Sequence, residues 1–161
     1  MIGDAAVAAR ALACLDLTNL EADCDAAAID ALCARAVTPH GAVAAVCVWP
    51  AFVAQAKRLL RDGPVRVATV VNFPAGTASV AEVVVETRSA LADGADEIDL
   101  VVPWRALAEG RPEAVTEMVG AIRAAAGAAT LKTILETGEL ADPGLIRARP
   151  RSPEAAGPAP G

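Results

Sequence analysis

Two charged residues stand inside runs of sequence that otherwise read as buried strands. Lys132 lies in LKTILETGEL (131–140), and Asp99 lies in DEIDLVV (96–102). Because apolar and charged residues alternate, both side chains are predicted to lie on the inner face of neighbouring strands. Burying either charge alone is unfavourable by several kcal/mol, so the two are expected to pair. The residues alone fit a structural ion pair or a catalytic acid–base pair.

A lysine offers a second kind of chemistry, because a partly neutral amine can attack a carbonyl to form an imine. The chain has two lysines, Lys57 and Lys132. Lys57 lies in the amphipathic segment 51–63 and is predicted to be a solvated helix residue. By the alternation along its strand, Glu136 is expected to face inward with Lys132, and Leu135 is expected to face the helices.

Three further polar residues lie in or just after predicted strands, namely Asp16, Thr18 and Cys47. Asp16 fits either a strand position or a turn former for the helical segment that begins near Glu21. An isolated cysteine in an apolar strand, such as Cys47, is most often a small core residue. His40 lies in a loop and is predicted to be a surface residue.

Five runs rich in Val, Ile and Leu, each ending in turn residues, are the predicted strands. They are 12–17, 43–49, 65–73, 96–102 and 129–136. Helical segments alternate with them, including 21–37 and 79–94, and Ser79 with Glu82 predicts a capping box for the latter. This alternation predicts a parallel α/β sheet made of right-handed βαβ units.

Two closures fit such a sheet. A doubly wound sheet can be complete with five strands, whereas a (β/α)8 barrel needs eight and typically about 250 residues. The chain has 161 residues, and no glycine-rich nucleotide-binding motif follows a strand. Length therefore favours the open sheet, and the inward charges favour the barrel.

The composition argues against several classes of protein. With 55% hydrophobic residues the chain is expected to be globular, and without a long apolar run or a basic start it is expected to be cytoplasmic and not to bind membranes. Four cysteines without C-x-x-C spacing and a single histidine give no support for a metal site. A formal charge of −6 with few aromatic residues argues against nucleic-acid binding.

The C-terminal stretch has a different character. Prolines stand at positions 150, 153, 158 and 160, which neither a helix nor a packed core accommodates. Residues 1–147 are therefore predicted to form the folded domain, and 148–161 a Pro/Ala-rich disordered tail. A natural linker, a truncated chain and a reading-frame change would each produce such a shift.

Five motifs, in their order and separations, resemble the deoxyribose-phosphate aldolase family over residues 11–147. They are LDLTNL (15–20), VCVWPAFV (46–53), VATVVNFPAG (67–76), GADEIDLVVPWRAL (94–107) and LKTILETGEL (131–140). The resemblance implies a (β/α)8 TIM-type barrel, of which about five βα units are present here. It implies a class I aldolase that reversibly cleaves 2-deoxyribose 5-phosphate to acetaldehyde and glyceraldehyde 3-phosphate, without a metal or organic cofactor.

The resemblance also implies roles for particular residues. Asp99 would act in proton relay with Lys132 beside it, and Asp16, Thr18 and Cys47 would line the substrate pocket. The family forms its imine with a lysine in a segment resembling F-I-K-T-S-T-G-K, which does not occur in the printed sequence. Lys132 is therefore not expected to be the imine former. A non-catalytic half-barrel that associates with a partner, or with itself through open sheet edges, is the alternative.

Overall fold

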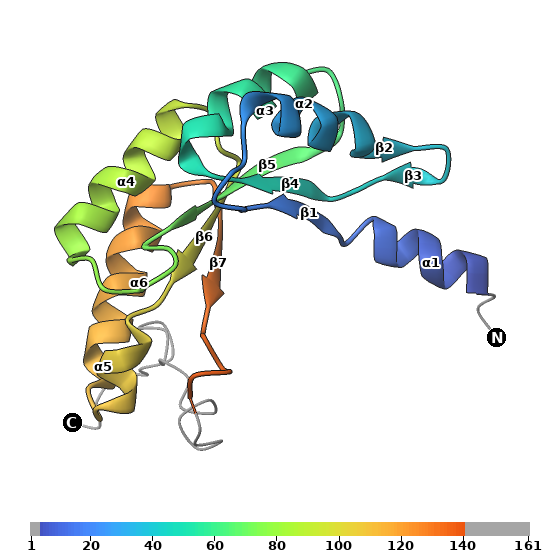
Figure 1. Ribbon diagram of the computed structural model, residues 1–161. Helices are drawn as coiled ribbons and strands as arrows, with labels where there is room; N and C mark the ends of the chain where they lie inside the picture. Colours follow the sequence, from blue (N-terminus) through green and yellow to red (C-terminus); the bar gives the residue numbers. More distant parts are fainter. Residues whose placement is uncertain (1–3, 141–161) are drawn as a thin grey trace, which may run out of the picture.

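The computed structural model of the chain describes residues 4–140 and shows a curved parallel sheet with helices packed on one of its faces (Figure 1). The sheet has the strand order β1-β4-β5-β6-β7, and every neighbouring pair is parallel. Its strands are β1 (Asp16–Asn19), β4 (Ala45–Val48), β5 (Arg66–Val71), β6 (Glu97–Val101) and β7 (Thr130–Ile134).

The connections between these strands run through helices, as the alternation of the sequence predicts. A 3-10 turn, η1 (Pro50–Phe52), precedes α3, and a short antiparallel hairpin, β2 (Val37–Thr38) with β3 (Gly41–Ala42), lies between α2 and β4. The helices are α1 (Asp4–Leu12), α2 (Ala26–Arg35), α3 (Val53–Leu60), α4 (Val80–Ala92), α5 (Trp104–Ala108) and α6 (Pro112–Ala126).

The main core fills the space between the sheet and the helices. Every second residue of a strand points to this side of the sheet, and these residues form one side of the core. The apolar faces of α2, α3, α4 and α6 form the other side. Its fully buried members include Val46, Val48, Val67, Val71, Ile98 and Leu100 from the strands, and Ile29, Leu32, Val53, Val83 and Ile122 from the helices.

The opposite face of the sheet carries a smaller apolar cluster. Its buried members are Ala45, Cys47, Ala68 and Val70, and Leu20, Trp49, Phe73 and Ile134 pack against them. The strands are therefore apolar on both faces, as in a parallel barrel, where one face meets the helices and the other fills the interior. The five strands and their helices form part of a (β/α) barrel, which confirms the predicted fold class.

Four of the five predicted strands are confirmed within a few residues, and the first is wrong in its position. Residues 12–15 are not extended, because α1 continues to Leu12 and the chain turns before β1 begins at Asp16. The alanine-rich start of the chain favours helix, a propensity that outweighed the apolar run. The last strand ends at Ile134, so Glu136 lies beyond it, at φ 50°, and the predicted inward alternation does not extend to Glu136.

Two helix starts are set by side-chain caps. The capping box of α4 is present as predicted: Glu82 N donates to Ser79 Oγ, and Ser79 N donates to Glu82 Oε2. Helix α2 begins later than position 21, since Asp25 is its N-cap and accepts a hydrogen bond from Ala28 N at 2.8 Å. Asp25, and not Asp16, therefore caps α2, and Asp16 is the first residue of β1.

Within residues 4–140 no helix combines the length and apolar character that a membrane crossing requires. The predicted tail, 148–161, lies outside the described residues, so the division into a domain and a tail stays a prediction.

Candidate functional site

Lys132 lies on the inner face of the sheet among three carboxylates. Its Nζ is 3.1 Å from Asp99 Oδ1 and 3.2 Å from Glu97 Oε2, and it donates a hydrogen bond to Asp16 Oδ2. The side chains of Glu97 and Asp99 are only 13% and 14% exposed, and that of Lys132 is 36% exposed. The predicted pairing of Lys132 with Asp99 is thus confirmed, within a larger cluster.

Strand register explains most of this cluster. Asp99 and Lys132 are directly paired across β6 and β7, and Glu97 precedes Asp99 by two residues on the same face. Asp16 comes from β1, at the opposite edge of the five-stranded sheet. The sheet therefore brings Asp16 to Lys132 although their strands, β1 and β7, lie at opposite ends of the strand order.

The cluster shifts the pKa values of Lys132 and Asp99. Burial lowers the pKa of Lys132, but the hydrogen bond to Asp16 and the charge of Asp99 outweigh that effect, so the pKa stands above its ordinary value of 10.5. Burial raises the pKa of Asp99 above 3.8, and the charges of Asp16 and Glu97 add to this rise while Lys132 opposes it. Lys132 is therefore a cation at neutral pH, unsuited to attack a carbonyl, and Asp99 is the carboxyl whose proton affinity is raised.

Cys47 is buried beside this cluster, with its Sγ 3.9 Å from Asp99 Oδ2. Burial, together with the charge of Asp99, raises the pKa of the Cys47 thiol to about 12. The thiolate is the reactive form of cysteine, so Cys47 is protonated and unreactive at neutral pH. It serves as a buried residue of the inner face.

Thr18 is not brought into the cluster. Its side chain is exposed, and its hydroxyl donates to the carbonyl oxygen of Asp16 at 3.2 Å. A role for Thr18 in binding therefore stays a prediction.

Two members of the site escaped the sequence-based prediction, Glu97 and Arg66. Arg66 Nη1 lies 3.7 Å from Glu97 Oε1 and 3.4 Å from Thr130 Oγ1, at the start of β5. The signal for Glu97 was its two-residue spacing from Asp99 in the DEIDL run. For Arg66, the first residue of a strand, no signal distinguished it from an ordinary surface arginine.

Lys57 is a residue of helix α3 with a side chain 42% exposed, as predicted, but it also has an ion-pair partner that the sequence did not predict. Lys57 Nζ forms an ion pair with Asp96, 2.6 Å from Oδ1 and 2.8 Å from Oδ2, and Asp96 also accepts a hydrogen bond from Val67 N. This pair joins α3 to the segment entering β6 and is separate from Lys132. His40 is exposed on the β2–β3 hairpin, as expected.

Two aromatic residues lie just after the C-terminal ends of β4 and β5 and contact each other. Trp49, after β4, and Phe73, after β5, meet edge to face with ring centroids 5.4 Å apart, and Trp49 Nε1 donates to the carbonyl of Glu21. Both rings pack on the cluster that contains Cys47. The charged groups and the apolar rings therefore line different parts of the same inner face.

The segment carrying Phe73 is fixed by Asn72, which is buried and has φ 58°. Its Nδ2 donates to Val101 O at 2.8 Å, its Oδ1 accepts from Ala78 N at 2.9 Å, and its backbone N–H donates to Glu86 Oε2. Asparagine tolerates this left-handed conformation better than most residues. The loop from β5 to α4 is thus held at both of its ends.

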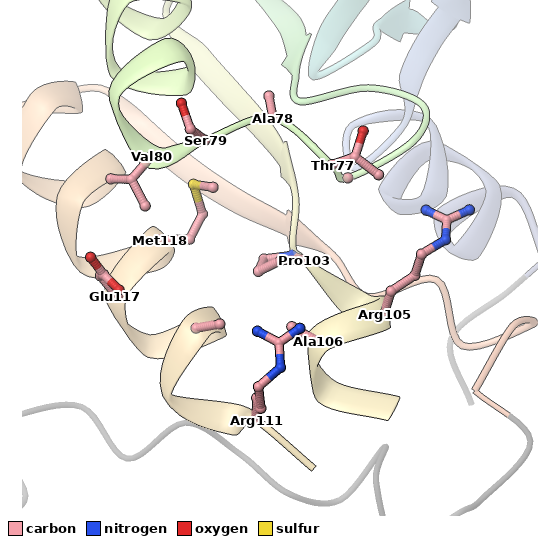
Figure 2. Close-up of a pocket in the computed structure, with 12 residues that line it drawn as sticks. Thr77, Ala78, Ser79, Val80, Pro103, Arg105, Ala106, Arg111, Glu117 and Met118 are labelled. Carbon is pink, nitrogen blue, oxygen red and sulfur yellow. The ribbon is translucent and has the colours of Figure 1, made fainter. Parts of the chain in front are cut away.

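A separate cavity of about 300 Å³ lies between the start of α4 and helices α5 and α6 (Figure 2). Ser79, Arg105, Arg111, Glu117 and Met118 are among its lining residues, and none of the predicted site residues is. In residues 4–140, no group of three or more His, Cys, Asp or Glu side chains is arranged to hold a metal ion.

The fold and the inner-face cluster define a (β/α)-barrel protein with a partly buried set of acid–base groups. The sequence profile of the DeoC/LacD family aldolases matches residues 10–155. The chain belongs to this family of aldolases.

Individual relatives agree with the profile. The chain is 55% identical over 142 residues to a deoxyribose-phosphate aldolase of Agrobacterium fabrum (strain C58 / ATCC 33970), covering 87% of this chain and 55% of that protein. The chain thus spans about half the length of this curated relative.

Among the solved structures that share the fold are two that are each provisionally described as a deoxyribose-phosphate aldolase. One, from Coccidioides immitis, has a TM-score of 0.76 and 36% identity, and the match covers 80% of this chain and 50% of the other. The other, from Toxoplasma gondii ME49, has a TM-score of 0.78 and 30% identity, and the match covers 87% of this chain and 54% of the other.

Proposed function

We propose that this chain provides the acid–base part of a deoxyribose-phosphate aldolase site, which reversibly cleaves 2-deoxyribose 5-phosphate to acetaldehyde and glyceraldehyde 3-phosphate through a lysine imine. The observation that carries the proposal is the contact of Lys132 with Asp99 and Asp16 on the inner face. Membership of the aldolase family supplies the reaction class. The substrate would be a small phosphorylated sugar, and no metal or organic cofactor takes part.

In the proposed reaction, cleavage of the C2–C3 bond requires a proton to leave the C3 hydroxyl and a proton to reach C2 of the resulting enamine. Asp99 is suited to this transfer, because its pKa is raised and so lies closer to neutral pH than that of an ordinary aspartate. Lys132, fixed as a cation, would hold Asp99 in place and stabilise the negative charge that develops on oxygen. Asp16, Thr18 and Cys47 are proposed to line the substrate pocket.

The imine would form on a different lysine. A lysine whose pKa is raised stays protonated and lacks the free electron pair that attacks a carbonyl. Lys57, the other lysine of the printed sequence, is engaged by Asp96. The imine is accordingly assigned to neither of these two lysines.

Trapping and turnover test this division of roles. The chain is incubated with acetaldehyde and borohydride, and peptide mass mapping locates any added ethyl group. We expect no stoichiometric label on Lys132, and full labelling there would overturn its assignment. In a preparation that turns over 2-deoxyribose 5-phosphate, D99N is expected to lower kcat by about 10² or more, whereas D62N, at an exposed aspartate, leaves it unchanged.

A second candidate function is a half-barrel that pairs with another protein or with itself. Two observations favour it: β1 and β7 each have a hydrogen-bonded neighbour on one side only within residues 4–140, and Leu15 and Leu135 are 45% and 40% exposed. Sedimentation velocity at increasing concentration tests it. Association that grows with concentration, without turnover of 2-deoxyribose 5-phosphate, would favour this candidate, and an active monomer would exclude it.

A further inference from the structure

Glu97 is the member of the inner-face cluster to which neither the sequence motifs nor the proposed reaction gives a task. Its two carboxylate oxygens point to two different cations: Oε1 lies 3.7 Å from Arg66 Nη1, and Oε2 lies 3.2 Å from Lys132 Nζ. The carboxylate is nearly buried, with a side-chain exposure of 13%, and it bridges β5 and β7 from β6.

Lys132 alone does not balance the three carboxylates of this cluster, and Arg66 reduces the imbalance. Around Lys132 stand Asp16, Glu97 and Asp99, so one ammonium faces three carboxylates. Enclosed like charges repel one another and resist ionisation unless a cation compensates them. Arg66 supplies the second positive charge and reaches only Glu97 among the three carboxylates.

The contacts of Glu97 connect Arg66, at the N-terminal end of β5, to Lys132 on β7. Arg66 is the first residue of β5, so its contact anchors Glu97 from the N-terminal side of the sheet. Glu97 in turn holds Lys132, whose other two carboxylates, Asp16 and Asp99, come from β1 and β6. An ammonium held from three sides has fewer accessible rotamers than one held from two, which favours a single position.

We propose that Glu97, anchored by Arg66, is a positioning residue that fixes the Lys132 ammonium between Asp16 and Asp99. Glu97 acts through Lys132 and contacts neither substrate nor reacting atoms. Its consequence for catalysis rests on the proposed aldolase function, whereas its effect on Lys132 does not. The charged and titratable groups that face Lys132 and Asp99 in this cluster are Asp16 on β1, Cys47 on β4, Arg66 on β5 and Glu97 on β6.

The composition of the chain permits a direct test, because Lys57 and Lys132 are its two lysines. In a full-length sample labelled with ¹⁵N-lysine, Nζ spectroscopy gives one signal for each ammonium, and Lys57 is an internal reference from a separate ion pair. We expect E97Q to move the Lys132 signal and to speed its hydrogen exchange about tenfold, as loss of a charged partner predicts, without moving Lys57. E97D is expected to restore part of the original signal.

The controls separate positioning from a general change of fold. E117Q, at an exposed glutamate of α6, is expected to move neither lysine signal. An unmoved Lys132 signal in E97Q, or equal movement of both lysines, would overturn the proposal. Should E97Q not fold, R66M supplies the test, with movement of Lys132 alone supporting the anchor and no movement refuting it.

Turnover then gives an independent reading. In a preparation active on 2-deoxyribose 5-phosphate, E97Q is expected to lower kcat about tenfold with KM unchanged, because Glu97 would position the relay without binding substrate. Absence of turnover in the unmodified chain would count against the aldolase function and would leave the spectroscopic result on Glu97 standing.

Discussion

Lys132 on β7 contacts Asp16 on β1, although these strands are the two edges of the sheet. Four strand spacings of about 4.8 Å would separate the edges by about 19 Å in a flat sheet, which a lysine and an aspartate cannot bridge. The contact is thus possible only because the sheet curls towards the face that carries the charges. Curvature of the barrel type is therefore what converts scattered strand residues into one cluster.

Removal of the Lys132 charge is predicted to destabilise the fold. K132M leaves Asp16, Glu97 and Asp99 close together with Arg66 as the remaining cation of the cluster. Breaking a buried pair typically lowers the free energy of unfolding by 3–5 kcal/mol, and partial exposure of Lys132 reduces our expectation to about 2 kcal/mol. Urea unfolding at pH 7 measures it, with K57M, at the more exposed pair, expected to lose about 1 kcal/mol or less.

The same variant carries a pH signature. Because the folded-state pKa of Lys132 is raised above 10.5, its stabilising contribution is fully present below that pH and is lost as the pH rises through the folded-state value. The difference in unfolding free energy between the unmodified chain and K132M should therefore shrink above pH 10.5. If the difference in unfolding free energy stayed constant at the highest pH at which the chain remains folded, the raised pKa of Lys132 would be contradicted.

Asp99 is predicted to show a pH dependence in the same direction, but in the acidic range. Its pKa is raised in the folded state, so relative to D99N the unmodified chain is most stable below about pH 3.8 and loses this advantage as the pH rises through the folded-state pKa. Urea unfolding of both proteins across this range measures the effect. D62N, at an exposed residue, serves as the control, and an equally pH-dependent gap for D62N would exclude Asp99 as the cause.

The sequence predicted the Asp99–Lys132 pair because the pair depends on local rules. Alternation along a strand decides which face a side chain takes, and neighbouring parallel strands place equivalent positions side by side. The contact of Asp16 depends on curvature of the whole sheet, which no local pattern reveals. For that reason the residues alone left open whether Asp16 is a strand residue or a turn former.

Other misses have similar causes. The ion pair of Lys57 was not predicted, because an amphipathic pattern indicates which side of a helix is apolar and gives no information on a partner such as Asp96, which lies 39 residues further along the chain. The displaced start of the first strand reflects alanine, which suits helix and core alike and so blurs the pattern before Asp16.

Cys47 is predicted to resist alkylation. With its pKa raised to about 12, its thiolate fraction at pH 8 falls about a thousandfold below that of an ordinary cysteine, and burial adds to the protection. Iodoacetamide at pH 8 should therefore label the exposed Cys14 well before Cys47, as peptide mass mapping resolves. D99N should speed Cys47 labelling, because the Asp99 charge contributes to the raised pKa. Comparable labelling of Cys14 and Cys47 in the folded chain would refute this prediction.

Gly76 is predicted to be indispensable to the loop between β5 and α4. It has φ 67°, and a Cβ added there would lie 2.7 Å from Val102 O and 3.2 Å from Trp104 Cδ1. Arg105 Nη1 holds the preceding carbonyl, that of Ala75, at 2.6 Å, so the loop has little room to move away.

G76A should accordingly lower the free energy of unfolding by about 2 kcal/mol or more, through backbone strain and overlap with the carbonyl. The matched control is Gly120, inside α6, where an added Cβ meets nothing within 4 Å. G120A should raise stability by up to about 1 kcal/mol, because alanine is the better helix former. Urea unfolding of the two variants compares one chemical change at two backbone conformations, and a neutral G76A would show that the loop relaxes despite its anchors.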